Sequence, residues 1–165
     1  GVAPSLMWLS LRQNKFGPAG ARALAAALHR GAMPKLEKLF LGYNGGLDSQ
    51  GITALAAPLR MQPALKSLVV PGCEIGDEGV ASLFANLGKD DFKALEYLDL
   101  SQNGHMTDKV CAFLVAALDS DALPRLCQMH VCHFAWSSAE GGSAALKAVD
   151  DALARAAGRR LARAS

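Results

Sequence analysis

The sequence predicts an α/β solenoid, a short horseshoe arc with a parallel sheet on its concave side and helices on its convex side. The pattern Leu-x-x-Leu-x-Leu-x-x-Asn, or a close variant, occurs five times, and its first leucine recurs every 29–31 residues. An apolar triplet with helical spacing follows each copy. Units of this size that return at a fixed period stack on one another and share a continuous core. The first leucines are Leu6, Leu36, Leu65, Leu95 and Leu126.

Each copy of the pattern predicts a strand, because apolar and other residues alternate across its middle. Three copies close with asparagine, at Asn14, Asn44 and Asn103. An asparagine there can bond backbone groups where the chain leaves the strand. Cys73 closes the third copy and can do this less strongly, whereas Phe134 closes the fifth and cannot.

A helix is expected after each strand, because three apolar residues spaced by three and then four lie on one helical face. Prolines precede four of the repeats by two residues and end the helix before them. Pro58 lies within the second helix and should shorten or kink it. The triplets are Ala21/Leu24/Leu28, Ile52/Leu55/Leu59, Val80/Leu83/Leu87, Cys111/Leu114/Leu118 and Gly142/Ala145/Val149, and the prolines are Pro4, Pro34, Pro63 and Pro124.

The chain resembles the ribonuclease-inhibitor-like class of leucine-rich repeats from Pro4 to about residue 155. The stretches that carry this resemblance most clearly are Asn14 to Leu28 and Cys73-Glu-Ile-Gly-Asp-Glu-Gly-Val-Ala-Ser-Leu83. The resemblance implies a strand and a true helix in each repeat and a function in binding other proteins. It is specific for fold and unspecific for the partner.

The length predicts a single leucine-rich repeat domain over 1–165. The repeats are expected at about 4–33, 34–62, 63–92, 93–123 and 124–155, with a helical tail to 165. The chain opens almost directly on a repeat, and solenoids need polar caps at their ends. We therefore expect it to be part of a longer protein, and the alternative is a self-contained short protein with a small exposed edge.

Composition favours a protein partner in the cytoplasm. The net charge of +2 favours neither nucleic acid nor an acidic membrane. No apolar stretch approaches the roughly 20 residues that span a bilayer. The four cysteines lack the close clustering of extracellular caps, which favours reduced thiols and a cytoplasmic location. No cofactor, metal or small-molecule substrate is expected.

The candidate binding site is the concave face, where the residues between the framework leucines point away from the core. Stacking places them in columns about 4.8 Å apart from strand to strand. Exposed aromatics and arginine are common at binding hot spots. The columns are Trp8/Lys38/Ser67/Tyr97/Gln128, Ser10/Phe40/Val69/Asp99/His130 and Arg12/Gly42/Pro71/Ser101/Cys132. The predicted contacts are Trp8, Arg12, Lys38, Phe40, Val69, Tyr97, Asp99 and His130.

Two more specific roles for this face, a zinc site and a catalytic site, do not fit the expected geometry. Alternation turns His133 away from His130 and Cys132, and Cys127 precedes the strand, so too few ligands converge for zinc. Asp99, His130 and neighbouring hydroxyl or thiol groups suggest an acid, a base and a nucleophile, but an open sheet offers no water-excluded pocket. We expect a surface Asp99–His130 pair and no catalytic residue.

The carboxyl-terminal stretch is rich in alanine and predicts a solvated helix that partly caps the stack and frays beyond Gly158. A basic contact for an acidic partner or nucleic acid is the alternative use of its arginines. The arginines are Arg155, Arg159, Arg160 and Arg163.

These observations predict a protein–protein interaction module, the scaffold or sensor part of a larger intracellular protein. An alternative is a regulatory protein that docks on an enzyme, because the activator of the Ran GTPase is similar to this repeat class. No stretch matches that activator better than the class in general, and the chain has no acidic tail. A third alternative is a spacer whose concave face contacts nothing.

Overall fold

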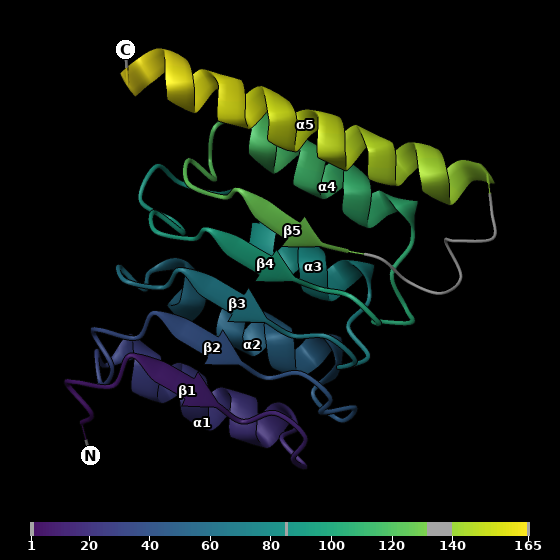
Figure 1. Cartoon of the computed structure of the whole chain (residues 1–165). Helices are drawn as coiled ribbons and strands as arrows, with labels where there is room; N and C mark the ends of the chain where they lie inside the picture. The colour runs from purple at the N-terminus through teal and green to yellow at the C-terminus, as the bar shows by residue number, and fades with distance from the viewer. Residues whose placement is uncertain (1, 85, 132–139, 165) are drawn as a thin grey trace.

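Five strands lie side by side in one sheet, and a helix follows each of them (Figure 1). The computed structural model describes residues 2–84, 86–131 and 140–164. The strands are β1 (Trp8–Ser10), β2 (Lys38–Phe40), β3 (Ser67–Val69), β4 (Tyr97–Asp99) and β5 (Gln128–His130). The helices are α1 (Pro18–His29), α2 (Asp48–Arg60), α3 (Asp77–Phe84), α4 (Asp108–Asp119) and α5 (Glu140–Ala164).

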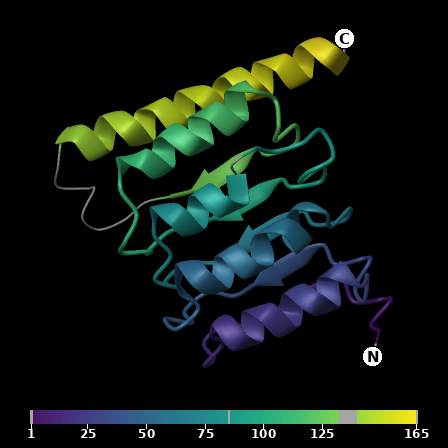
Figure 2. The same cartoon turned by 180° about the vertical axis from the view of Figure 1, so that it is seen from behind.

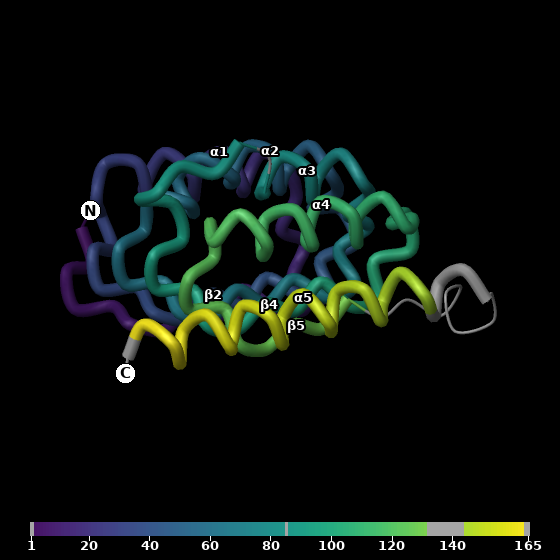
Figure 3. Tube along the Cα trace, turned by 90° about the horizontal axis from the view of Figure 1, so that it is seen from above, coloured from purple at the N-terminus to yellow at the C-terminus, as the bar shows by residue number. Residues whose placement is uncertain are grey.

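The sheet is parallel, and its strand order follows the chain from β1 to β5. Helices α1 to α4 form a layer behind the strands, as the reverse view and the view from above show (Figures 2 and 3). Each strand returns beside its predecessor because one repeat buries its apolar side only against the next. This confirms the predicted α/β leucine-rich repeat solenoid.

The core lies between the two layers and is built from the framework positions. Leu39, Leu68 and Leu98 point inward from the middle of their strands and have no exposed surface. They meet the helical triplets, of which Ile52 and Leu55 are equally buried. Burying such a side chain contributes about 1.5–3 kcal/mol. The alternation that buries these leucines also points their neighbours toward the concave surface.

An asparagine of the second repeat forms hydrogen bonds with the backbone that follows the first strand. Asn44 is almost completely buried, and its Oδ1 accepts the backbone N–H groups of Asn14 at 2.9 Å and Phe16 at 3.1 Å. Its Nδ2 donates to the carbonyl oxygens of Leu11 at 2.9 Å and Leu41 at 2.6 Å. One side chain thus satisfies backbone groups of two repeats that would otherwise be buried without partners.

Asn103 repeats this arrangement further along the stack. Its Oδ1 accepts the N–H groups of Cys73 at 2.8 Å and Ile75 at 3.1 Å, and its Nδ2 donates to the carbonyls of Val70 and Leu100. Between the two asparagines, the Cys73 thiol donates to the Leu41 carbonyl with a sulfur–oxygen distance of 3.2 Å. Burial raises the pKa of this thiol, which keeps it protonated as a donor. Cys73 therefore takes the place of the asparagine with weaker hydrogen bonds, as expected. Phe134 lies outside the described residues.

Two helices differ from the expected lengths. Helix α2 runs for 13 residues and continues past Pro58, so Pro58 does not shorten it, and the alternative of a kink stays a prediction. Pro58 lies in the last turn, where it interrupts little, and Arg60 Nε fixes that turn by donating to the Leu83 carbonyl at 2.9 Å. Helix α3 ends at Phe84, so Leu87 lies beyond it. The rings of Phe84 and Phe92, with centroids 5.8 Å apart, are buried in the core, and Leu87 packs against it as a partly buried residue.

Helix α5 runs along α4 at the end of the stack and is the longest element of the chain (Figures 1 and 3). It buries Val149, Ala152 and Ala156 against the last repeat. It continues to Ala164, so the predicted fraying beyond Gly158 is wrong. Its small apolar residues allow close helix packing, and its arginines add the contacts described below.

Candidate functional site

Equivalent residues of the repeats form straight rows across the concave surface. The register pairs each strand residue with its counterpart one repeat away. The framework residues separate two rows that point toward the concave surface, as strand alternation predicts. The side chains in these rows range from exposed, as at Trp8, through half-buried, as at Phe40, to buried at Ser67. The first row is Trp8, Lys38, Ser67, Tyr97 and Gln128, and the second is Ser10, Phe40, Val69, Asp99 and His130.

The first two repeats carry what we call the aromatic–cation cluster: Trp8, Lys38, Phe40, Arg12 and Tyr43. Trp8 is 64% exposed, and its ring centroid lies 5.5 Å from that of the half-buried Phe40. Lys38 Nζ lies 5.9 Å from the Trp8 centroid, and Arg12 Cζ lies 4.6 Å from the Tyr43 centroid. Such cation–ring contacts fix the side chains at a modest gain of about 0.5–1 kcal/mol each when exposed.

The sequence prediction missed Tyr43. Its backbone has a φ of 58°, in the left-handed region that non-glycine residues seldom adopt. The equivalent residues Gln13 and Gln102 share this conformation, so the turn after the strand imposes it in several repeats. An aromatic residue directly before the closing asparagine was the available signal, and the turn conformation brings its ring under Arg12.

The last two strands carry a second aromatic contact. The rings of Tyr97 and His130 lie 5.5 Å apart, and burial, with the negative charge of Asp99, raises the pKa of the Tyr97 phenol. Asp99 Oδ1 accepts the Ser101 N–H at 2.9 Å. The described contacts contain no Asp99–His130 ion pair, so the expected surface pair is wrong although the two residues are neighbours in register. Asp99 instead binds the backbone of the turn, and His130 contacts the Tyr97 ring.

A shallow hollow of about 460 Å³ connects the two halves of the face. Predicted contacts Lys38, Phe40, Val69 and Tyr97 lie in its wall, so the structure brings them together. It is lined by Lys38, Phe40, Lys66, Ser67, Val69, Glu96, Tyr97, Cys127 and Gln128.

Three residues of this hollow were missed because they precede the first row. Lys66, Glu96 and Cys127 each follow the first leucine of their repeats. Lys66 Nζ lies 3.0 Å from Glu37 Oε1, an ion pair between adjacent repeats. Opposite charges at this repeat position were the signal that could have identified Lys66 and Glu96.

The metal interpretation gains no further ligands from the described residues. Cys127 is exposed in the wall of the hollow, while His130 faces the Tyr97 ring. Across residues 2–84, 86–131 and 140–164, no group of three His, Cys, Asp or Glu side chains could hold an ion. Cys132 and His133 lie outside these ranges.

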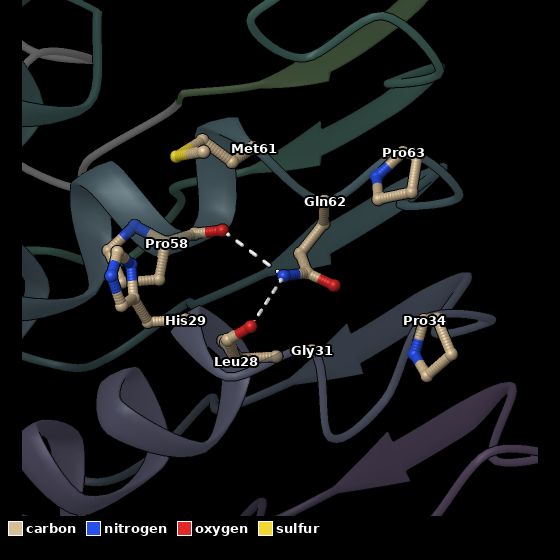
Figure 4. A pocket seen from close by; sticks show the side chains of 8 residues that line it. All are labelled: Leu28, His29, Gly31, Pro34, Pro58, Met61, Gln62 and Pro63. Carbon is tan, nitrogen blue, oxygen red and sulfur yellow. Dashed lines mark hydrogen bonds between the residues drawn. The ribbon is translucent and has the colours of Figure 1, made fainter.

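A second hollow, of about 260 Å³, lies away from the concave face at the carboxyl ends of α1 and α2 (Figure 4). Gln62 is 7% exposed and its Nε2 donates to the carbonyls of Leu28 at 3.4 Å and Pro58 at 3.3 Å. The last carbonyls of a helix have no partners within that helix. Gln62 therefore caps two adjacent helices at once, which explains its burial.

The arginines of α5 make contacts within the molecule, while the side chains of Arg155 and Arg163 stay 49% and 65% exposed, in keeping with the expected solvated helix. Arg155 donates to both carboxylate oxygens of Asp119, and Arg163 pairs with Asp121. Arg159 donates to the Leu118 carbonyl at 2.7 Å, and Arg160 to the Leu126 carbonyl at 2.7 Å. These four arginines thus contact the carboxyl end of α4 and the loop after it, and the carboxyl end of a helix carries negative partial charge.

Comparison with known proteins places this geometry among repeat proteins. A family model described as "Leucine Rich repeat" matches residues 2–25 and 63–84. Tonsoku-like protein of Bos taurus is 39% identical over 106 residues, which are 62% of this chain and 8% of that protein. Protein NLRC5 of Mus musculus is 32% identical over 136 residues, which are 82% of this chain and 6% of that protein. The chain therefore spans less than a tenth of the length of either relative.

Solved structures share the fold at low sequence identity. The leiomodin-1 actin-binding site 2 has a TM-score of 0.70 at 15% identity, with 97% of this chain and 88% of that chain covered. The tropomodulin carboxyl-terminal domain of Caenorhabditis elegans has a TM-score of 0.65 at 19% identity, with 96% and 89% covered. Within the described residues, no helix combines the length and apolar character needed to cross a membrane.

Proposed function

Because the chain is a leucine-rich repeat protein, we propose that it is a recognition module that binds a partner protein through the concave face of its sheet. The observation that carries this proposal is the exposed Trp8 ring beside Phe40. A large aromatic surface that is held in water on the first strand of the sheet gains free energy when a partner covers it. The scaffold needs neither cofactor nor catalytic residue for this function.

The shape of the face limits what it can hold. Five strands at about 4.8 Å spacing span about 19 Å from first to last. This width suits a loop, a helix or one edge of a globular protein. The hollow between Phe40 and Tyr97 offers a place for one apolar side chain of the partner.

The convex surface supports recognition less well. Two exposed apolar side chains there lie on separate elements: Met61, at 66% exposed, follows the end of α2, and Phe113, at 37% exposed, lies on α4. Isolated apolar side chains of this kind are normal on protein surfaces. The leiomodin-1 neighbour is an actin-binding site, which provides a precedent for protein binding by this fold.

The proposal is tested by affinity capture from source-cell lysate with the whole chain. The test variant carries Phe40→Asp, Tyr97→Ala and Asp99→Lys, and circular dichroism checks that it folds. A matched control carries Phe113→Asp, which removes an aromatic ring from the convex side. Partners that are lost with the concave variant and kept with the control support the proposal.

An identical set of partners from wild type and concave variant would contradict it. The alternative of GTPase activation rests on the resemblance alone, and a turnover assay with each captured GTPase distinguishes it from simple binding. The cytoplasmic location stays a prediction from cysteine spacing.

A further inference from the structure

We propose that the aromatic–cation cluster receives an acidic, apolar-containing peptide segment of the partner protein. This inference rests on the proposed function and adds the chemistry of the segment that binds. It starts from Arg12 and Lys38, which project from the first two repeats onto the concave side. Both cations lie against aromatic rings, and among the described residues neither forms an ion pair with a carboxylate.

The other cations near this face already have acidic neighbours. Lys66 pairs with Glu37 at 3.0 Å, and Arg125 NH1 lies 3.9 Å from Glu96 Oε1. At the equivalent position the first repeat carries Met7, which is 52% exposed. The repeat pattern therefore supplies a carboxylate in the second and fourth repeats and omits it in the first. The missing negative charge is the complement that a partner can bring.

The aromatic rings decide what accompanies that charge. Trp8 and Phe40 present apolar surface directly beside Lys38. A carboxylate that pairs with Lys38 would place its neighbouring residues against these rings. Contact with an apolar side chain removes that surface from water and strengthens the adjacent charge pair by excluding solvent. We therefore expect Asp or Glu next to a large apolar residue in the bound segment.

The opposite half of the face favours a peptide over a nucleic acid. Asp99 and Glu96 lie on the fourth strand and just before it, where a phosphate chain that crossed the sheet would meet negative charge. The net charge of the chain is only +2. A peptide can place its acidic residue at the first two strands and a neutral or basic residue near Asp99, whereas every nucleotide carries a phosphate.

The test is selection from a displayed library of random peptides of about 12 residues, which extend to roughly 40 Å. Selection uses the whole chain and is repeated with Arg12→Gln/Lys38→Gln. The matched control is Arg22→Gln/Lys109→Gln, which removes the same charge from exposed positions on α1 and α4. We expect wild type to select peptides with Asp or Glu beside a large apolar residue. These peptides should bind the concave double variant roughly tenfold more weakly and the control unchanged.

A charge-reversed variant, Arg12→Glu/Lys38→Glu, provides the converse test, and it should select basic peptides. Selected peptides without an acidic excess that still lose binding on Phe40→Asp would overturn the acidic inference and support the proposed function. Peptides that are insensitive to Phe40→Asp would contradict both. Acidic peptides that lose equal affinity on both double variants would overturn the inference, because net charge alone would then explain binding. A labelled single-stranded oligonucleotide bound through Arg12 and Lys38 more tightly than the peptides would also overturn it.

Discussion

Arg155 donates two hydrogen bonds to Asp119, from Nε to Oδ1 at 3.1 Å and from Nη2 to Oδ2 at 2.9 Å. The pair joins the middle of α5 to the last residue of α4. A bidentate pair of this geometry is stronger and more directional than a single contact. It fixes the position of the helix that lies against the last repeat.

Asp119→Asn should loosen α5 without unfolding the repeats. The substitution removes the charge that Arg155 and Arg159 share. Amide hydrogen exchange should accelerate in α5 and stay unchanged in α1 and α2. The control is Asp151→Asn, whose partner Lys147 lies within the same helix. Equal acceleration in both variants would show that the link between helices is unimportant.

Acid should release the same helix before it unfolds the stack. The hydrogen bond from Arg155 holds the pKa of Asp119 below its ordinary value, and the charges of Arg155 and Arg159 act in the same direction. A carboxyl group with a lowered pKa in the folded state contributes stability above its ordinary pKa and loses it as pH falls through the folded value. Hydrogen exchange in α5, corrected for intrinsic rates, should therefore rise below about pH 4. Asp119→Asn should reduce this pH dependence, and what remains would report on Asp121, which pairs with Arg163.

Asn103→Ala should destabilise the chain far more than Asn14→Ala. Asn103 serves four buried backbone groups of two repeats, whereas Asn14 is exposed and donates only to carbonyls of its own repeat. Leaving such groups without partners should cost about 3 kcal/mol for Asn103, against less than about 1 kcal/mol for Asn14. Urea unfolding measures both. Similar midpoints for the two variants would argue against a role of the asparagine in joining repeats.

Cys73→Asn should stabilise the fold. The thiol makes only weak contacts, to the carbonyls of Leu41 and Pro71. At the equivalent positions, Asn44 and Asn103 each satisfy two N–H groups and two carbonyls. An asparagine at this position in all three repeats should raise the free energy of unfolding by about 1 kcal/mol. Cys73→Ala is the control and should lower it. A loss of stability with asparagine would mean that the buried site is too small for the amide.

Thiol alkylation should distinguish the cysteines and report on the concave face. Cys127 is exposed in the hollow, whereas Cys73 is buried and its pKa is raised by that burial. Since the thiolate is the reactive form, iodoacetamide should modify Cys127 quickly and Cys73 only after unfolding. Peptide mass spectrometry reads each site. A partner that covers the hollow should protect Cys127, and unchanged labelling in a saturated complex would place that partner elsewhere.

The sequence alone was sufficient for the architecture and for the rows of the concave face. A strand places every second residue on one face, and a repeat of nearly constant length brings Trp8, Lys38 and Tyr97 to equivalent places. These relationships follow from backbone periodicity and from the apolar positions that must be buried, both of which are written in the chain.

Only the tertiary structure decided which partners the polar side chains take. Asp99 turns to the Ser101 N–H, and His130 rests on Tyr97, although their register permits a pair. The arginines of α5 bind the end of α4, more than 30 residues away, which no local pattern encodes. Periodicity is a property of the backbone and does not depend on which side chains contact one another. A polar side chain instead chooses among competing partners that only the folded chain brings within reach.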